Sequence, residues 1–211
     1  MRREGGGVQQ LRTREAAEKL ALHAAQSGDE HEKLMAEGAQ YDSKVDWRRA
    51  ARSLREAIAL KPHQPTAYFN LGHVLSNSGR DVEAAQQYLE ARVRSSVGLE
   101  GWATATAAAF HVLKLEVCSE AAEPEWWNDE GLKALSARVL RAAPNEMPAL
   151  DMRARVLSGS SVAWEAGPRS AAELKQAATH FDRSAALCNA PAWKAKLSWL
   201  ADLCRSEAEA L

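Results

Sequence analysis

The stretch Pro65-Thr66-Ala67-Tyr68-Phe69-Asn70-Leu71-Gly72-His73-Val74-Leu75 decides the fold expected for this chain. Its key residues recur at i, i+3, i+4 and i+7, a spacing that places them along one side of an α-helix. They are Tyr68, Leu71, Gly72 and Leu75. Because a glycine inside a helix costs about 1 kcal/mol relative to alanine, we expect a neighbouring helix to pass Gly72 too closely for a Cβ atom.

The pattern repeats at an interval of ~34 residues. Leu34, Tyr68 and Trp102 follow one another at that spacing, and Gly38 precedes Gly72 by the same interval. A second helical stripe repeats in the same register, with Ala50, Leu54 and Ala57 followed by Ala84, Tyr88 and Ala91. Residues suited to turns and helix N-caps stand between the stripes, at Asp46 and at Gly79-Arg80-Asp81. The interval predicts successive helix-turn-helix units.

Residues 31–98 resemble two tetratricopeptide repeats, which are helix-turn-helix units of ~34 residues. The resemblance rests on Asn70-Leu71-Gly72, Gly79, Glu83-Ala84 and Tyr88-Leu89-Glu90-Ala91, and on Ala50, Leu54, Ala57 and Pro62 of the preceding unit. It departs at Glu37 and Ser96, where the family usually has an apolar residue and a proline. A weaker resemblance extends over residues 99–189. The resemblance implies an all-α fold, a right-handed α-solenoid of such repeats with a C-terminal capping helix.

The expected organisation begins with a tail and a helix over residues 1–30, where the helix would occupy residues 8–26. A solenoid follows over residues 31–189, with units at 31–64, 65–98, 99–144 and 145–189. A capping helix over residues 190–211 ends the chain. The third and fourth units are both longer than the first, by a similar amount, and the additional residues carry Trp126, Trp127 and Trp164.

The three tryptophans have two readings. Insertions at the same place in adjacent repeats emerge on one edge of a solenoid, so we expect Trp126, Trp127 and Trp164 to lie near one another as a loop-edge patch. Tryptophan is enriched in binding hot spots, which favours a contact surface. Alternatively, the extensions lengthen helices and the indoles pack down to cover them.

The resemblance also implies a concave groove lined by the first helix of each repeat, where a peptide or partner helix binds. The groove residues would be Met35, Phe69, Asn70, His73, Asn77, Thr104, Ala107, His111 and Arg153. Asn70 offers a donor and an acceptor to an extended backbone, although a structural role for it is the alternative. One subgroup of the family clamps acidic chaperone tails with lysine, arginine and asparagine. Only Asn70 fits that clamp, so we expect no tight binding to such tails.

Composition narrows the classes of function. A formal net charge of −1 disfavours nucleic acid as a partner, and no run of apolar residues is long enough to span a membrane. The six histidines and three cysteines show no metal-ligand spacing, and there is no phosphate-binding glycine loop or nucleophile motif. We therefore expect no metal, no cofactor and no catalytic residue. The absence of a signal-like apolar segment near the start favours the cytoplasm.

These observations predict a non-catalytic scaffold for protein–protein interaction. It would bind a peptide, a helix or a subunit of unknown identity through the groove or the loop edge. The first alternative is a structural or self-associating subunit of a larger assembly, with Trp193 and Trp199 on the last helix as a docking surface. The second alternative is a co-chaperone-like adaptor.

Overall fold

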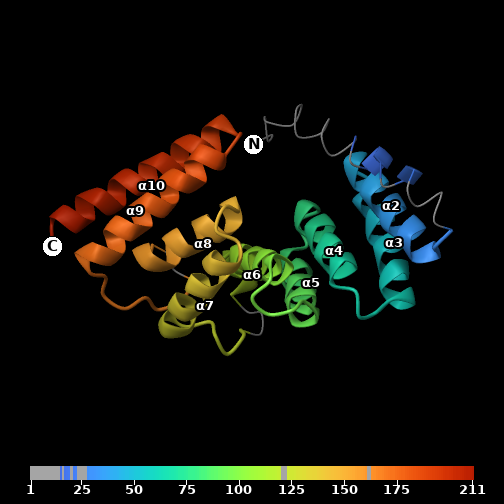
Figure 1. Cartoon of the computed structure of the whole chain (residues 1–211), viewed down its shortest axis with the longest axis horizontal. Coiled ribbons are helices and arrows are strands. Elements are labelled where there is room, and N and C mark those ends of the chain that lie inside the picture. The colour runs from blue at the N-terminus through green and yellow to red at the C-terminus, as the bar shows by residue number, and fades with distance from the viewer. Residues whose placement is uncertain (1–14, 16, 20, 23–27, 120–122, 161–162) are drawn as a thin grey trace. The chain divides into compact units, whose positions relative to one another are not determined.

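The computed structural model describes residues 15, 17–19, 21–22, 28–119, 123–160 and 163–211 (Figure 1). The described residues form helices joined by turns and loops, with no strand among them. The all-α class of consecutive helix-turn-helix repeats is thereby confirmed. The helix expected over residues 8–26 falls mostly outside the described residues.

The chain divides into two compact units, unit 1 (Met1–Arg94) and unit 2 (Ser95–Leu211). In unit 1, consecutive helices pack against one another: α2 (Glu30–Ser43), α3 (Trp47–Leu60), α4 (Pro65–Asn77) and α5 (Asp81–Arg94). In unit 2, the elements are α6 (Glu100–Leu113), the 3-10 helix η1 (Glu116–Cys118), α7 (Asp129–Ala142), α8 (Met147–Ser158), α9 (Ala171–Leu187) and α10 (Pro191–Glu209). Figure 1 shows α9 and α10 side by side at the C-terminal end, where they pack closely.

Local sequence signals explain where several helices begin. The Asp46 carboxylate accepts a hydrogen bond from the Arg49 backbone N–H and caps α3, as expected from the sequence. Pro65 occupies the first turn of α4, where its missing N–H costs nothing. Ser170 and Glu173 form a capping box at the start of α9. These caps satisfy backbone N–H groups that have no partner inside the helix.

The close helix approach expected at the repeated glycines is present in unit 1. A Cβ atom on Gly38 would lie 2.8 Å from Leu54 Cγ, and one on Gly72 would lie 2.9 Å from Tyr88 Cδ1. Leu54 and Tyr88 are themselves one repeat apart, so the same contact recurs in both repeats. The sequence period thus reflects one helix crossing built twice.

The core of unit 2 is larger and more aromatic. Trp102, Phe110 and Phe181 are fully buried. The expected second-helix stripe of α9 is buried at Ala177, Phe181 and Ser184. α10 covers α9 with Leu197, Leu200 and Cys204, whereas Trp193, expected on the same side, is partly exposed because it lies in the first turn of α10.

The turns within the two repeats of unit 1 share an unusual backbone conformation. Gly79, between α4 and α5, has φ +79°, and Val45, between α2 and α3, has φ +63°. The two positions are one repeat apart, so the repeat requires a left-handed residue there. Glycine adopts this conformation freely, but a β-branched residue is a true outlier. The turn of the first repeat is therefore strained at Val45.

Candidate functional site

The predicted groove residues of unit 1 lie on the first helices α2 and α4. We call this surface the α2/α4 face, defined by Met35, Phe69, Asn70, His73 and Asn77. None of the five is fully buried, and the His73 side chain is 54% exposed. Met35 packs partly against the core residues Leu34, Ala57 and Ala67. The α2/α4 face is accessible, with an apolar end at Met35 and Phe69 and a polar end at His73 and Asn77.

Side chains on this face are only partly committed to internal contacts. His73 Nδ1 lies 3.5 Å from Asp42 Oδ2, which links α4 to α2, and the Asn77 amide lies 3.3 Å from the same ring nitrogen. The Phe69 ring lies 5.4 Å from the Tyr88 ring, measured between centroids. Within the part of the chain that the structure describes, the half-buried Asn70 amide forms no hydrogen bond. The Asn70 amide therefore has a hydrogen-bond donor and an acceptor that no described protein group uses.

The predicted groove residues of unit 2 are occupied within the fold. Ala107 is 0% exposed because α6 packs against both α7 and α8, so its assignment to a contact surface is wrong. Arg153 donates from Nη1 to the Lys133 carbonyl at 2.8 Å and to Ser136 Oγ at 3.1 Å. His111 Nε2 lies 3.1 Å from the Pro148 carbonyl oxygen, and Thr104 Oγ1 donates to the Glu100 carbonyl. Arg153 and His111 thus link neighbouring helices, whereas the Thr104 hydrogen bond stays within α6 and is exposed.

The extra residues of the two enlarged repeats lie between α6 and α7 and between α8 and α9, and they bring the three tryptophans together. The ring centroids of Trp127 and Trp164 are 5.9 Å apart, and Trp126 lies 5.7 Å from Trp127. Trp127 and Trp164 each lie 5.7 Å from Phe110 of α6. Trp127 Nε1 also donates to the Ala163 carbonyl at 3.0 Å, which ties the two loops together.

These contacts favour the second of the two readings, in which the indoles pack down, over an exposed patch. Trp127 and Trp164 are each 7% exposed, and only Trp126 is half-buried. Their indoles turn inward because Phe110 and the partner indole offer apolar surface that water does not. We call Phe110, Trp126, Trp127 and Trp164 the aromatic cluster. The aromatic cluster packs the two loops against α6 and leaves little tryptophan surface accessible to a partner.

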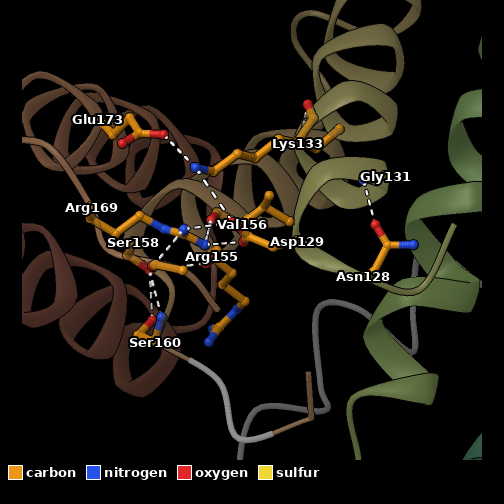
Figure 2. A network of polar contacts seen from close by, with 12 residues as sticks. Asn128, Asp129, Gly131, Lys133, Arg155, Val156, Ser158, Ser160, Arg169 and Glu173 are labelled. Carbon is orange, nitrogen blue, oxygen red and sulfur yellow. Dashed lines mark hydrogen bonds and ion pairs between the residues drawn. The ribbon is translucent and has the colours of Figure 1, made fainter. Parts of the chain in front are cut away.

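A polar network braces the same two repeats (Figure 2). Arg169, before α9, donates to Asp129 Oδ2 at 3.0 Å and to the Val156 carbonyl at 3.0 Å. Lys133 of α7 pairs with Glu173 of α9 at 2.8 Å. The hydrogen bond from Arg169 is the main cause of the lowered pKa of Asp129, and that from Lys133 lowers the pKa of Glu173 to about 2. Both carboxylates are thus held ionised as structural partners.

A buried group of charges between α6 and α8 was missed by the sequence reasoning. Arg155 Nε donates to Asp151 Oδ2 at 2.8 Å, and both residues are buried. Asp151 Oδ2 also lies 3.5 Å from His111 Nδ1. Burial lowers the pKa of His111 to about 4 and that of Lys114 to about 8. The only sequence signal was the opposite charges of Asp151 and Arg155 at i and i+4, a spacing also common on exposed helices.

Metal and membrane features were also sought in the described residues. Among them, no three His, Cys, Asp or Glu side chains converge to hold a metal ion, and Cys118, Cys188 and Cys204 are free thiols. No described helix combines the length and apolar character needed to cross a membrane.

Comparisons with known proteins agree with the fold. No family model matches the chain, and no curated protein matches it. The chain is similar to the solved structure from the functional characterization of PilF of Pseudomonas aeruginosa, a protein that contains tetratricopeptide repeats. The TM-score is 0.61 over 95% of this chain and 89% of that chain, with 17% sequence identity. At this identity the likeness shows the fold alone: a protein of tetratricopeptide-like helical repeats.

Proposed function

We propose that this protein is a non-catalytic scaffold for protein–protein interaction, and that its α2/α4 face binds an extended peptide segment of a partner. The helical-repeat fold supports the class of function, because such repeats commonly present first-helix faces to partners. The observation that carries the choice of face is the uncommitted Asn70 amide, which stands beside accessible apolar side chains.

The chemistry of the face fits the backbone of a peptide more than any one side chain. The Asn70 amide donates to a peptide carbonyl and accepts from a peptide N–H, so the same pair of bonds forms with many sequences. Asn70 is half-buried and its amide atoms remain open to water, so a bound peptide would replace water at the amide without displacing an internal partner. Phe69 and Met35 supply apolar contact, and His73 and Asn77 supply polar contacts at the rim.

The test combines identification of the partner with a measurement of affinity. Immobilised protein captures a partner, mass spectrometry identifies it, and calorimetry measures its binding to the purified chain. Asn70→Ala removes up to two hydrogen bonds of about 1 kcal/mol each, so we expect the affinity to fall by about ten- to thirtyfold. Gln86→Ala, an exposed change on α5, is the matched control and should leave the affinity unaltered.

A second candidate function is self-association through the last helix. Trp199 on α10 is 60% exposed, an unusual position for a tryptophan, and Trp193 on the same helix is partly exposed. Light scattering across concentration, with Trp199→Glu as the variant, separates the two candidates. Two results together would favour self-association over peptide binding at the α2/α4 face. The protein would form a concentration-dependent dimer that Trp199→Glu abolishes, and the affinity for any captured partner would be unchanged by Asn70→Ala and by Phe69→Ala.

A further inference from the structure

An open cavity lies at the turn edge of unit 1, formed by the α2–α3 turn, the first turns of α3 and the α4–α5 turn. Its volume is about 510 Å³, within the range of ~300–1,000 Å³ that holds ligands in other proteins. The cavity shares no lining residue with the α2/α4 face. We call it the turn-edge cavity; the lining residues that matter here are Lys44, Val45, Trp47, Arg48, Arg55 and Leu75.

Three cations around this cavity are uncommitted. In the described ranges of the chain, Lys44, Arg48 and Arg55 form no ion pair and no side-chain hydrogen bond, and all three are exposed. The other charges of the lining are satisfied: Arg80 is bound by Glu83, and Asp46 by Arg49. In a chain with a formal net charge of −1, three free cations on one cavity form a locally positive site.

Apolar residues also line the cavity. Leu75 is buried and Trp47 is half-buried, and we call these two side chains the apolar floor. Val45, another apolar lining residue, is 50% exposed and has the left-handed conformation that Gly79 adopts one repeat later. Glycine would relieve the backbone at this position and would remove an apolar side chain from the lining. A strained residue beside an open cavity suggests the hypothesis that its side chain contacts a ligand there.

We propose that the turn-edge cavity binds an acidic peptide segment of a partner protein. Carboxylates of the peptide pair with Lys44, Arg48 and Arg55, and an adjacent apolar side chain of the peptide packs against Trp47 and Val45. Nucleic acid is the weaker fit, because phosphate recognition needs an extended basic surface and this cavity offers three cations over an apolar floor. A small inorganic anion would leave that floor unused. This site is additional to the α2/α4 face.

The test is direct binding of defined probes, measured by fluorescence anisotropy. The probe is a labelled peptide in which glutamates flank a leucine; the comparison probes carry glutamine in place of glutamate, or are a labelled single-stranded oligonucleotide. We expect binding of the glutamate peptide only, weakening as salt is raised because the cations are exposed. Equal binding of the glutamine peptide, tighter binding of the oligonucleotide, or no binding of the glutamate peptide would overturn the proposal.

Variants locate the probe on the molecule. Arg55→Glu should lower the affinity for the glutamate peptide by at least about tenfold, since it turns an attraction into a repulsion. Arg52→Glu makes the same charge change three residues away on α3, outside the cavity lining, and should change the affinity less than about threefold. Equal losses in the two variants would mean unspecific charge attraction and would overturn the site. Circular dichroism checks that both variants fold.

Two further variants distinguish the turn-edge cavity from a purely structural turn and from the α2/α4 face. Val45→Gly should lower the affinity for the glutamate peptide several-fold and raise the unfolding temperature. A valine with a purely structural role would not give these opposite effects. Asn70→Ala should leave the glutamate peptide bound as in the unaltered chain. If Asn70→Ala abolished binding of the glutamate peptide, the peptide would bind at the α2/α4 face and the turn-edge site would be refuted. If the glutamate peptide did not bind the protein at all, the turn-edge proposal would be wrong and the α2/α4 proposal would be unaffected.

Discussion

Units 1 and 2 are both built of paired helices, yet they use the first helix of each pair differently. In unit 1, glycines at Gly38 and Gly72 let the second helix approach closely, and the side chains of the α2/α4 face stay accessible. In unit 2, the corresponding helices α6 and α8 carry buried charges and support the aromatic cluster. The same helical framework thus leaves a surface free in one unit and consumes it in the other.

In this protein the enlarged repeats and the regular repeats contribute differently to the accessible surface. In the sequence, the long loops that carry Trp126, Trp127 and Trp164 are the most distinctive part of this chain. In the structure they are braces: Trp127 donates to the loop that carries Trp164, and Arg169 joins the second loop to α7. The short-turned repeats, which look generic, hold both the uncommitted Asn70 amide and the turn-edge cavity.

The greatest loss of stability is predicted for the aromatic cluster, and it tests whether this cluster is structural. Phe110→Ala should destabilise unit 2 by about 3–5 kcal/mol, because it removes a fully buried ring that contacts Trp127 and Trp164 and leaves a cavity. Urea denaturation followed by tryptophan fluorescence reports this unit, since Trp47 is the one tryptophan in residues 1–94 and the other six lie in residues 95–211.

The matched variant for this prediction is Phe69→Ala in unit 1. Phe69 is half-buried, so we expect the free energy of unfolding to fall by no more than about 1–2 kcal/mol. Urea denaturation monitored by circular dichroism measures this change. Similar losses at Phe110 and Phe69 would mean that both faces are equally structural, and the comparison between the units would fail.

The second effect tests the close crossing in unit 1. Gly72→Ala should destabilise the protein by about 1–3 kcal/mol, because the added Cβ would lie 2.9 Å from two carbons of the Tyr88 ring, which itself packs near Phe69. Gly101→Ala on α6 is the control: its Cβ would meet only Ser95 Oγ at 3.9 Å, so better helix propensity should stabilise the protein by up to ~1 kcal/mol. A gain in both variants would remove the steric argument.

The sequence predicts the parts of this structure that rest on period and residue size. Gly72 opposite Tyr88 follows from the regular repeat, and the Asp46 cap follows from a short polar residue before a helix. The nearness of Trp127 and Trp164 follows from insertions at equivalent places.

Other features depend on tertiary contacts that leave no local pattern. Whether an indole is buried depends on the side chains that it contacts. Trp164 packs against Phe110, which lies more than one repeat earlier in the sequence, so no local pattern predicts the contact. Asp151 and Arg155 look like an exposed ion pair until α6 supplies His111 beside them. The turn-edge cavity combines two turns one repeat apart, so neither turn alone indicates it.

The third effect concerns the buried charges of unit 2 and acid. Burial lowers the pKa of His111 to about 4 from its ordinary 6.5, with Lys114 and Arg155 acting in the same direction and Asp151 and the Pro148 carbonyl opposing them. The unfolded chain therefore takes up this proton first as pH falls below 6.5, and stability is lost between pH 6.5 and about 4. We expect that loss to be about 1–2 kcal/mol, since the side chain retains some exposure to solvent.

Replacement of the imidazole checks this assignment. His111→Gln should flatten the stability profile between pH 6.5 and about 4, measured by urea denaturation at each pH. The slope that remains comes from His180, whose pKa is also lowered by burial and by Arg153 and Arg183, and at the acid end from Glu173 and Asp129, whose pKa values are lowered by Lys133 and Arg169. His63→Gln, an exposed change after α3, should leave the profile as it is. An unchanged slope in His111→Gln would show that the α6–α8 charges are open to solvent, as the charges of unit 1 are.

The smallest effect asks whether the turns of unit 1 are interchangeable. Val45→Gly removes left-handed strain of about 1–2 kcal/mol but adds about 0.5–1 kcal/mol of unfolded-chain entropy, so thermal unfolding should show a net gain of about 0.5–1 kcal/mol. Gly79→Val is the reverse change, and a Cβ there would have no atom within 4 Å, so its loss of about 1 kcal/mol would measure the backbone alone. A loss in Val45→Gly would mean that the valine side chain stabilises the free protein by more than its strained backbone costs. Val45 would then be explained by folding alone, and its strain would no longer support a binding role at the turn-edge cavity.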